Sequence, residues 1–252
     1  MLDTCKICGS ESEKEFERTL NRIDMRRITE NWYRCSVCGF LQTSALDSLS
    51  KAEIETMYSY PEYIKYDPFA KNHRRKNRSK EMVKYIERKF GIQNPKILLH
   101  GNGQCTSARE LLNEGYDVWT TFDRLENWDR SLSVEEAMYG EFDIVCAVEV
   151  IEHWSNPLPE IENVKKMLKA GCFFCGTTHV NDGIPKEAIE KNEWSYLGQK
   201  PINAGHCSIW SKKSISLIAD IFSMENHTDY FASEMPKIAP VPKTTIYFLF
   251  KK

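Results

Sequence analysis

The sequence predicts an α/β protein with a largely parallel sheet, preceded by a small metal-binding module. Two observations predict the sheet. Short apolar runs alternate with helix-like segments, and glycine or polar residues follow directly where those runs end. A third observation predicts the module, because two cysteine pairs, each followed by glycine, lie near the start of the chain. A chain of 252 residues can hold one sizeable domain and such an appendage.

Composition narrows the partners and the compartment. A formal net charge of −2 gives no general attraction to nucleic acid, so nucleic acid is not an expected partner. One local cluster of basic residues would favour binding of nucleic acid, although a solvated helix face is the simpler interpretation of that cluster. The cluster comprises Lys71, Arg74, Arg75, Lys76, Arg78 and Lys80. No segment resembles a secretion signal or approaches the ~20 apolar residues of a spanning helix, which predicts a soluble, cytoplasmic protein.

The cysteine pairs predict a structural metal site. Nine cysteines without a secretion signal favour free thiols and metal ligands over disulfides. Two CxxCG elements, over 5–9 and 35–39, can each form a tight turn that aims two sulfurs at one cation. Four thiolates leave no open coordination position, so we expect structural zinc; an iron–sulfur cluster is the alternative, and a redox pair is the weakest interpretation. The predicted ligands are Cys5, Cys8, Cys35 and Cys38.

Three regions follow along the chain: a metal module over 1–45, a helical connector over 46–90 and the main α/β domain over 91–252. The charged insert 11–34 has too little apolar content to fold unaided, so metal binding should supply its stability. The connector ends in an amphipathic helix, 80–90, which Gly91 stops.

The main domain opens with a strand and a glycine turn that can hold a ligand. Lys96 begins the strand, and Gly101 and Gly103 let the backbone approach a bound molecule closely. The next strand, 116–122, ends at Asp123, whose spacing from Gly103 suits a carboxylate that accepts hydrogen bonds from ribose hydroxyls. A helix cap is the alternative role of Asp123. Thr106 stands where the dinucleotide pattern GxGxxG has its third glycine, which counts against a nicotinamide enzyme.

The most informative segment is a strand, turn, helix and loop between Phe142 and Gly171. The apolar run 144–150 predicts a buried strand, and Glu152 and His153 follow it where parallel sheets present ligands. The segment resembles the fourth strand of class I S-adenosylmethionine-dependent methyltransferases, whose small-molecule branch shows FDxV, then ExxEH, then LxPGG. This resemblance implies a Rossmann-like, seven-stranded methyltransferase sheet and S-adenosylmethionine as the cofactor.

The resemblance reaches both ends of the chain. The cysteine leader, with Gln42, is similar to the zinc-binding leader of sugar-modifying methyltransferases, which runs CxxCG, an irregular insert, then CxxCGxxQ. Zinc ribbons also occur on methyltransferases of ribosomal RNA. Further on, Gly205 to Ser211 resembles the family's GHxxxFS element, and 225–230 and 244–251 are expected to form the last two strands of the sheet.

The cofactor loop departs from the methyltransferase pattern (D/E)xGxGxG. Leu99 stands in place of the acid that helps to hold the methionine end, and Cys105 replaces a glycine, so cofactor binding is expected to be altered or weak. Trp128 or Leu132 is expected to cover the adenine. The resemblance assigns cofactor binding to His100, Gly101, Asn102, Gly103, Asp123 and Glu149.

Methyl transfer is an in-line displacement, so the protein mainly aligns the nucleophile and removes its proton. Histidine suits that work near neutral pH. Three histidines follow predicted strands or stand in the glycine–histidine element, and each has a structural role as its alternative: His153, His179 and His206. A second hypothesis places Mg²⁺ or Mn²⁺ on Glu149, Glu152 and His153, because ubiquinone-pathway O-methyltransferases share this ExxEH element.

The preferred interpretation is an S-adenosylmethionine-dependent methyltransferase acting on a small polar metabolite, either a nucleotide-linked sugar or a polysaccharide precursor. RNA methylation, with the zinc module and the basic cluster gripping phosphates, is one alternative. The other is a catalytically retired methyltransferase fold that serves as a binding module, which Leu99 and Cys105 motivate.

Overall fold

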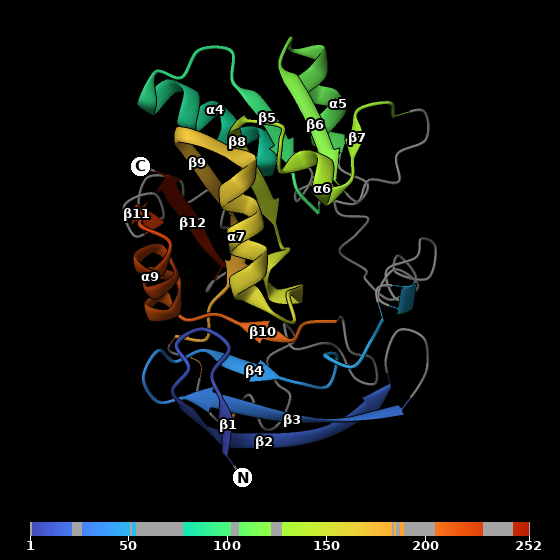
Figure 1. The fold of residues 1–252 in the computed structure, drawn as a ribbon, viewed down its shortest axis with the longest axis vertical. Helices are drawn as coiled ribbons and strands as arrows, with labels where there is room; N and C mark the ends of the chain where they lie inside the picture. Colours follow the sequence, from blue (N-terminus) through green and yellow to red (C-terminus); the bar gives the residue numbers. More distant parts are fainter. Residues whose placement is uncertain are drawn as a thin grey trace. The chain divides into compact units, whose positions relative to one another are not determined.

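The chain forms two compact units, each assembled from several chain segments (Figure 1). In this computed structural model the described residues are 2–21, 27–50, 52–53, 78–101, 106–121, 128–182, 184, 187–188, 205–228 and 244–251. The first unit comprises Met1–Asn72, Glu152–Pro157 and His179–Leu217; the second comprises His73–Ile151, Leu158–Thr178 and Ile218–Lys252. The module, connector and domain boundaries expected from the sequence stay predictions.

The first unit contains a five-stranded sheet in the order β1-β2-β3-β4-β10, with antiparallel neighbours. Its strands are β1 (Leu2–Thr4), β2 (Glu11–Asn21), β3 (Arg27–Cys35), β4 (Leu41–Thr43) and β10 (Ser208–Ile209). β10 comes from a distant part of the sequence, and its two residues pair with Leu41 and Gln42 of β4. A strand far along the chain therefore completes the sheet that carries the cysteines.

The resemblance predicted an irregular insert between the cysteine pairs, but the described part of the insert is regular. It consists of the long strands β2 and β3, which pair antiparallel from Ser12 opposite Cys35 to Asn21 opposite Arg27. Cross-strand side chains stabilise the pair, because Phe16 stacks on Trp32 with ring centroids 5.9 Å apart. The charged residues that suggested an unfolded insert form ion pairs across the strands instead: Arg34 with Glu15 and Arg18 with the buried Glu30.

The second unit contains the predicted seven-stranded sheet, in the order β11-β12-β9-β8-β5-β6-β7. Its strands are β5 (Lys96–Leu99), β6 (Asp117–Thr121), β7 (Ser131–Leu132), β8 (Phe142–Val148), β9 (Leu168–His179), β11 (Met224–Asn226) and β12 (Thr244–Lys251). The pairs among β5 to β9 are parallel, whereas β11 and β12 pair antiparallel as the predicted terminal hairpin. Parallel pairing brings the carboxyl ends of β5, β6 and β8 to one edge of the sheet.

Helices connect the strands and carry apolar faces onto them. They are α4 (Arg78–Phe90), α5 (Thr106–Asn113), α6 (Val134–Ala137), the short 3-10 helix η1 (Ile151–His153), α7 (Pro157–Met167) and α9 (Lys212–Ile221). α4 ends where its pattern predicts, since Gly91 adopts a left-handed φ of 69° and donates to the Glu87 carbonyl. Among the helices in the described ranges, none has the length and apolar content to cross a membrane.

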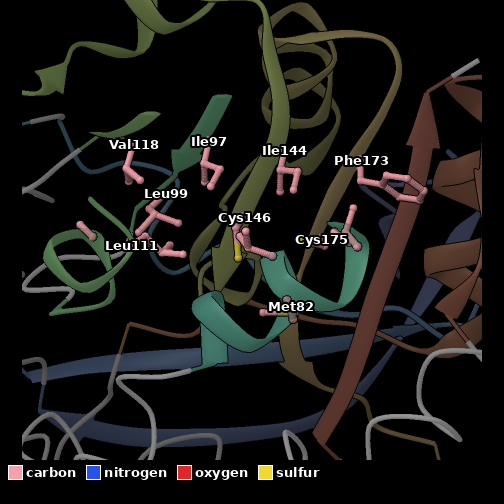
Figure 2. Close-up of a cluster of buried hydrophobic side chains, with 12 residues drawn as sticks. Met82, Ile97, Leu99, Leu111, Val118, Ile144, Cys146, Phe173 and Cys175 are labelled. Atoms are coloured by element: carbon pink, nitrogen blue, oxygen red, sulfur yellow. The ribbon is translucent and has the colours of Figure 1, made fainter. Parts of the chain in front are cut away.

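A buried apolar cluster joins α4 and α5 to four neighbouring strands of the second unit (Figure 2). Met82 of α4 and Leu111 of α5 pack against Leu99 of β5, Cys146 of β8 and their neighbours. Alternate strand residues such as Leu98 and Val145 are buried too, as expected for a sheet covered on both faces. This packing fixes the strand ends at which the candidate site lies.

Candidate functional site

The two cysteine pairs of the first unit form turns of the same geometry. Gly9 and Gly39 both adopt φ of 72°, a left-handed value that suits glycine. Each glycine donates its N–H to the carbonyl of the cysteine that opens its turn, over 3.0 Å to Cys5 and 2.9 Å to Cys35. The sequence spacing CxxCG thus folds into two matched loops whose sulfurs converge.

The four sulfurs fit a tetrahedral metal site. The Sγ atoms of Cys5 and Cys38 lie 3.6 Å apart, those of Cys8 and Cys35 lie 3.4 Å apart, and all four are within 4.8 Å of one another. A tetrahedron of sulfurs about 2.3 Å from zinc has edges of about 3.8 Å, whereas a disulfide needs about 2.05 Å. The donor set therefore suits one thiolate-bound cation rather than disulfides.

Electrostatics around the sulfurs already favour one thiolate. A hydrogen bond from the Cys38 thiol lowers the pKa of Cys5 to about 5, and the backbone N–H of Ile7 donates to the same sulfur over 3.4 Å. The same sulfur contact, together with burial, raises the pKa of Cys38. A bound cation would replace that shared proton and stabilise all four thiolates.

Polar side chains tie the cysteine turns to the rest of the first unit. Gln42 accepts from the N–H of Lys6 and donates to the carbonyl of Thr4, both over 2.8 Å, which clamps the first turn to β4. The second turn is held from elsewhere in the sequence: Asn181 donates to the Gly39 carbonyl over 2.9 Å, and the Ser211 hydroxyl donates to the Cys38 carbonyl. Gln42 and Ser211 stand in sequence motifs that gave no sign of these contacts, and Asn181 stands in no motif.

A second cluster in the first unit contains Glu152, His153 and His206, whose potential ligand atoms all lie within 4.8 Å of one another. Glu152 is fully buried, and the two imidazoles meet edge to face with centroids 4.7 Å apart. Backbone contacts join the two chain segments, because Cys207 N–H donates to the Glu152 carbonyl over 2.9 Å. Two of the three predicted catalytic histidines are thus brought together.

The tautomer of His153 follows from one contact. Its Nδ1 lies 3.2 Å from the carbonyl oxygen of Gly205, and a carbonyl oxygen only accepts, so Nδ1 carries the hydrogen. In the neutral ring Nε2 is then the nitrogen that can accept a proton or bind a cation. His179 ends β9, and its side chain lies outside the described residues.

In the second unit, His100 and Gly101 follow β5 and connect to the end of β6. The Nδ1 of His100 lies 2.8 Å from the Thr121 hydroxyl, which also accepts from the Gly101 N–H over 3.2 Å. Burial of His100 lowers its pKa to about 4, so the ring is neutral at physiological pH. Gly101 has φ of 66°, and an added Cβ would lie 2.9 Å from Val150. Thr121 had no signal in the sequence, because only the parallel register places it here.

Glu149 follows β8 and is held by a partner that the sequence did not suggest. Its carboxylate forms a 3.0 Å ion pair with Arg78, the first residue of α4, and both side chains are largely buried. The acid and histidines that the structure gathers are therefore Glu152, His153 and His206, and Glu149 is not part of that group. Asn102, Gly103 and Asp123, the other expected cofactor residues, lie outside the described residues and stay predictions.

The other sequence candidates have local partners. The Trp128 indole donates to Thr120 over 2.9 Å and packs against the apolar cluster, so its role over adenine stays a prediction, as does that of Leu132 in β7. Within the basic cluster, Lys80 pairs with Glu110 and Glu114. Lys71, Arg74, Arg75 and Lys76 lie outside the described residues.

Comparison with known proteins identifies the family. The sequence matches the model of a methyltransferase domain over residues 49–222, more than half of the chain. The chain belongs to this methyltransferase family. The predictions of the fold class and of an S-adenosylmethionine-dependent methyltransferase are confirmed at that level. The match begins after the four cysteines, so it leaves the likeness of the leader to that of sugar-modifying enzymes untested.

Solved structures share the fold of this methyltransferase. The plantazolicin methyltransferase BpumL, in complex with S-adenosylhomocysteine, aligns with a TM-score of 0.55 and 12% identity, covering 79% of this chain and 93% of its own. The 1,6-didemethyltoxoflavin-N1-methyltransferase of Burkholderia thailandensis aligns with a TM-score of 0.53 and 12% identity, covering 88% and 96%. A search of curated proteins gives no significant match.

Proposed function

We propose that this methyltransferase transfers a methyl group from S-adenosylmethionine to a small polar metabolite. The four-cysteine leader favours a nucleotide-linked sugar or a polysaccharide precursor as the substrate class. The observation that carries the proposal is the pair His153 and His206 beside the buried Glu152. Glu152 and His153 belong to the segment that follows β8, and His206 comes shortly before β10. Bound S-adenosylmethionine supplies an electrophilic methyl group on its sulfonium sulfur.

Binding of the cofactor is assigned to the carboxyl ends of β5, β6 and β8. Gly101 lets the backbone approach a ligand there, and the neutral His100 keeps the turn fixed to β6 through Thr121. Glu149 contributes a carboxylate after β8. The neighbours solved with S-adenosylhomocysteine support this assignment, because they share the fold. The remaining proposed contacts are Asn102, Gly103 and Asp123.

His153 is the proposed general base. The Gly205 carbonyl fixes its Nδ1 hydrogen, so Nε2 can take the proton of an acceptor hydroxyl as the methyl group is transferred. The buried Glu152 and the ring of His206 would stabilise the imidazolium that forms. His179 remains a candidate for the same role or for orienting the substrate.

The four cysteines are proposed to hold structural zinc. Their geometry leaves no position for a substrate, so zinc would stabilise the first unit rather than take part in the reaction. Metal analysis of the purified protein should give one zinc ion per chain; two or more iron atoms with acid-labile sulfide would assign an iron–sulfur cluster instead.

The test is a substrate screen with the zinc-loaded protein. S-adenosylmethionine is incubated with a panel of nucleotide sugars, and mass spectrometry detects products heavier by one methylene unit. His153→Gln is expected to lower kcat by about 10²- to 10⁴-fold while S-adenosylhomocysteine affinity stays unchanged. His227→Gln changes a histidine just after β11, outside this cluster, and is the matched control. Methylation of RNA alone would establish the alternative substrate, and full activity of His153→Gln would refute the base assignment.

A divalent cation at Glu152, His153 and His206 is a second candidate, favoured by the mutual distances of their ligand atoms. One carboxylate and two imidazoles can bind Mn²⁺ or, less favourably, Mg²⁺. Activity that survives removal of all metal except the cysteine-bound zinc would end this idea. Recovery of lost activity by added Mn²⁺ would support it and would recast His153 as a ligand.

A further inference from the structure

An ion pair between Arg78 and Glu149 joins α4 to the end of β8 in the second unit. Arg78 opens α4, and Glu149 follows β8, so the pair lies at the carboxyl end of the central strands. The side chains of Arg78 and Glu149 are 7% and 13% exposed, so both charged groups are largely desolvated. Val150, the next residue, lies against Gly101 of the cofactor turn.

Two costs argue against a purely structural pair. Taking two charges out of water commonly cancels the attraction between them, so a buried ion pair is weak evidence for stability. Glu149 also adopts φ of 55°, a left-handed conformation that is strained for a residue with a side chain. Strained, charged residues at strand ends are typical of binding sites.

The residues that end β5 do not supply the charges that such a site needs. Leu99 is apolar and fully buried within the core cluster, and burial keeps His100 neutral. Arg78 and Glu149 place a guanidinium and a carboxylate in contact with each other, 3.0 Å apart and therefore preorganised, and the next residue after Glu149, Val150, is the one that lies against Gly101.

We propose that Arg78 and Glu149 form the subsite for the amino-acid end of S-adenosylmethionine. That end carries an α-carboxylate and an α-ammonium group, which are complementary to the two side chains. The planar guanidinium of Arg78 donates to the α-carboxylate, and the carboxylate of Glu149 accepts from the α-ammonium. The pair thereby takes over the charge recognition that Leu99 cannot provide. This inference rests on the proposed function, since it assumes S-adenosylmethionine as the donor.

The experiment compares two ligands that differ at the amino-acid end. Calorimetry of the zinc-loaded full chain measures the Kd of S-adenosylhomocysteine and of 5′-methylthioadenosine, which lacks the carboxylate and the ammonium. Wild type is expected to prefer S-adenosylhomocysteine. Arg78→Met should weaken S-adenosylhomocysteine by about 10- to 100-fold, the size expected for lost hydrogen bonds to a charged group, and 5′-methylthioadenosine by less than about 3-fold. Arg78→Lys keeps the positive charge but lacks the paired N–H donors of the guanidinium. It should recover part of the preference for S-adenosylhomocysteine over 5′-methylthioadenosine.

Two further variants separate binding from folding. Arg88→Met makes the same substitution in the last turn of the same helix, at an exposed position, and should change neither Kd. Because Arg78→Met removes the cation beside a largely buried carboxylate, the double variant Arg78→Met/Glu149→Gln removes both charges. Its Kd for 5′-methylthioadenosine should equal that of wild type. Its Kd for S-adenosylhomocysteine should be no lower than its Kd for 5′-methylthioadenosine.

The outcomes distinguish this inference from the function beneath it. Suppose that wild type binds S-adenosylhomocysteine. If the variants keep its preference for this ligand over 5′-methylthioadenosine, or weaken both ligands equally, the subsite alone is overturned. A wild type that prefers neither ligand over the other also overturns the subsite alone. A wild type that binds neither ligand overturns the proposed donor and the subsite together.

Discussion

His100 is a buried imidazole next to the cofactor turn, and its environment makes stability depend on pH. Burial lowers its pKa to about 4, whereas an imidazole in the unfolded chain titrates near 6.5. Below about pH 6.5 the unfolded state therefore binds a proton that the folded state refuses. The contribution of His100 to stability is complete above pH 6.5 and is lost as the pH falls towards 4.

We expect this linkage to cost about 2 kcal/mol of unfolding free energy between pH 7.5 and pH 5. Urea unfolding at both pH values measures it, and His100→Asn, which cannot take up the proton, should reduce the difference by that amount. Carboxylates titrate in the same range in both proteins, so the comparison isolates His100. An identical pH dependence in wild type and variant would show that the ring is protonated in the folded state.

Gly101 is required by both its conformation and its neighbour. Its φ of 66° suits glycine, and an added Cβ would lie 2.9 Å from the Cγ1 of Val150. Gly91 has nearly the same φ, 69°, with nothing within 4 Å of such a Cβ. Gly91→Ala should therefore show the conformational cost of about 1 kcal/mol, and Gly101→Ala that cost plus about 1–3 kcal/mol of overpacking. Urea unfolding measures both, and adding Val150→Ala should recover the excess; equal losses would refute the steric argument.

The elements around the cysteines link the proposed metal site to β10. The second cysteine turn accepts hydrogen bonds from Asn181 and Ser211, and β4 pairs with β10, which closely follows His206 in the sequence. Metal binding should therefore order more than its own loops, because the neighbouring strands share their hydrogen bonds.

Removal of zinc is expected to speed amide exchange in β10. Hydrogen exchange with mass spectrometry should show residues 207–211 exchanging at least about tenfold faster in the stripped protein, which corresponds to about 1.4 kcal/mol of local opening. The amides of α4, in the second unit, are the internal reference and should keep their rates. Unchanged protection of β10 would mean that the cysteine turns hold their shape without metal.

Sequence patterns predicted those elements whose signal is local. The apolar run after Phe142, the helix ending at Gly91 and the terminal hairpin all appear, with ends shifted by only a few residues. The expectation of an irregular insert between the cysteine pairs was wrong, because cross-strand pairs stabilise its strands. Phe16 and Trp32 meet only through the pairing of β2 with β3, so they form no local pattern in the sequence.

The same reasoning explains which site residues escaped prediction. CxxCG and the glutamate–histidine pair are short motifs, so Cys5 and His153 could be proposed from the sequence alone. Thr121 and Arg78 contact His100 and Glu149 only because β6 and α4 bring them to the ends of β5 and β8, and nothing near them in the sequence marks those contacts. Residues whose role depends on register or on helix packing become visible only in three dimensions.

At the scale of the whole molecule, each unit is assembled from separate parts of the chain. The first unit takes residues from three separate stretches, so the cysteine leader shares its sheet with β10, which comes from the last of those stretches. Phe40 meets Trp210 edge to face with ring centroids 5.2 Å apart, and both rings are buried. If the predicted zinc-binding module over 1–45 folded by itself, it would not require these contacts.

Deletion of residues 1–45 decides between the two views. β10 would lose its partner β4, Trp210 would lose the ring of Phe40, and Ile209 would be exposed. Exposure of that apolar surface should give a protein that binds a hydrophobic dye, loses near-ultraviolet dichroism and unfolds without a sharp transition. The full chain stripped of zinc is the matched control, because it keeps β4 and should remain cooperative at a lower Tm. A truncated protein that unfolds as sharply as the control would establish the leader as a separable module.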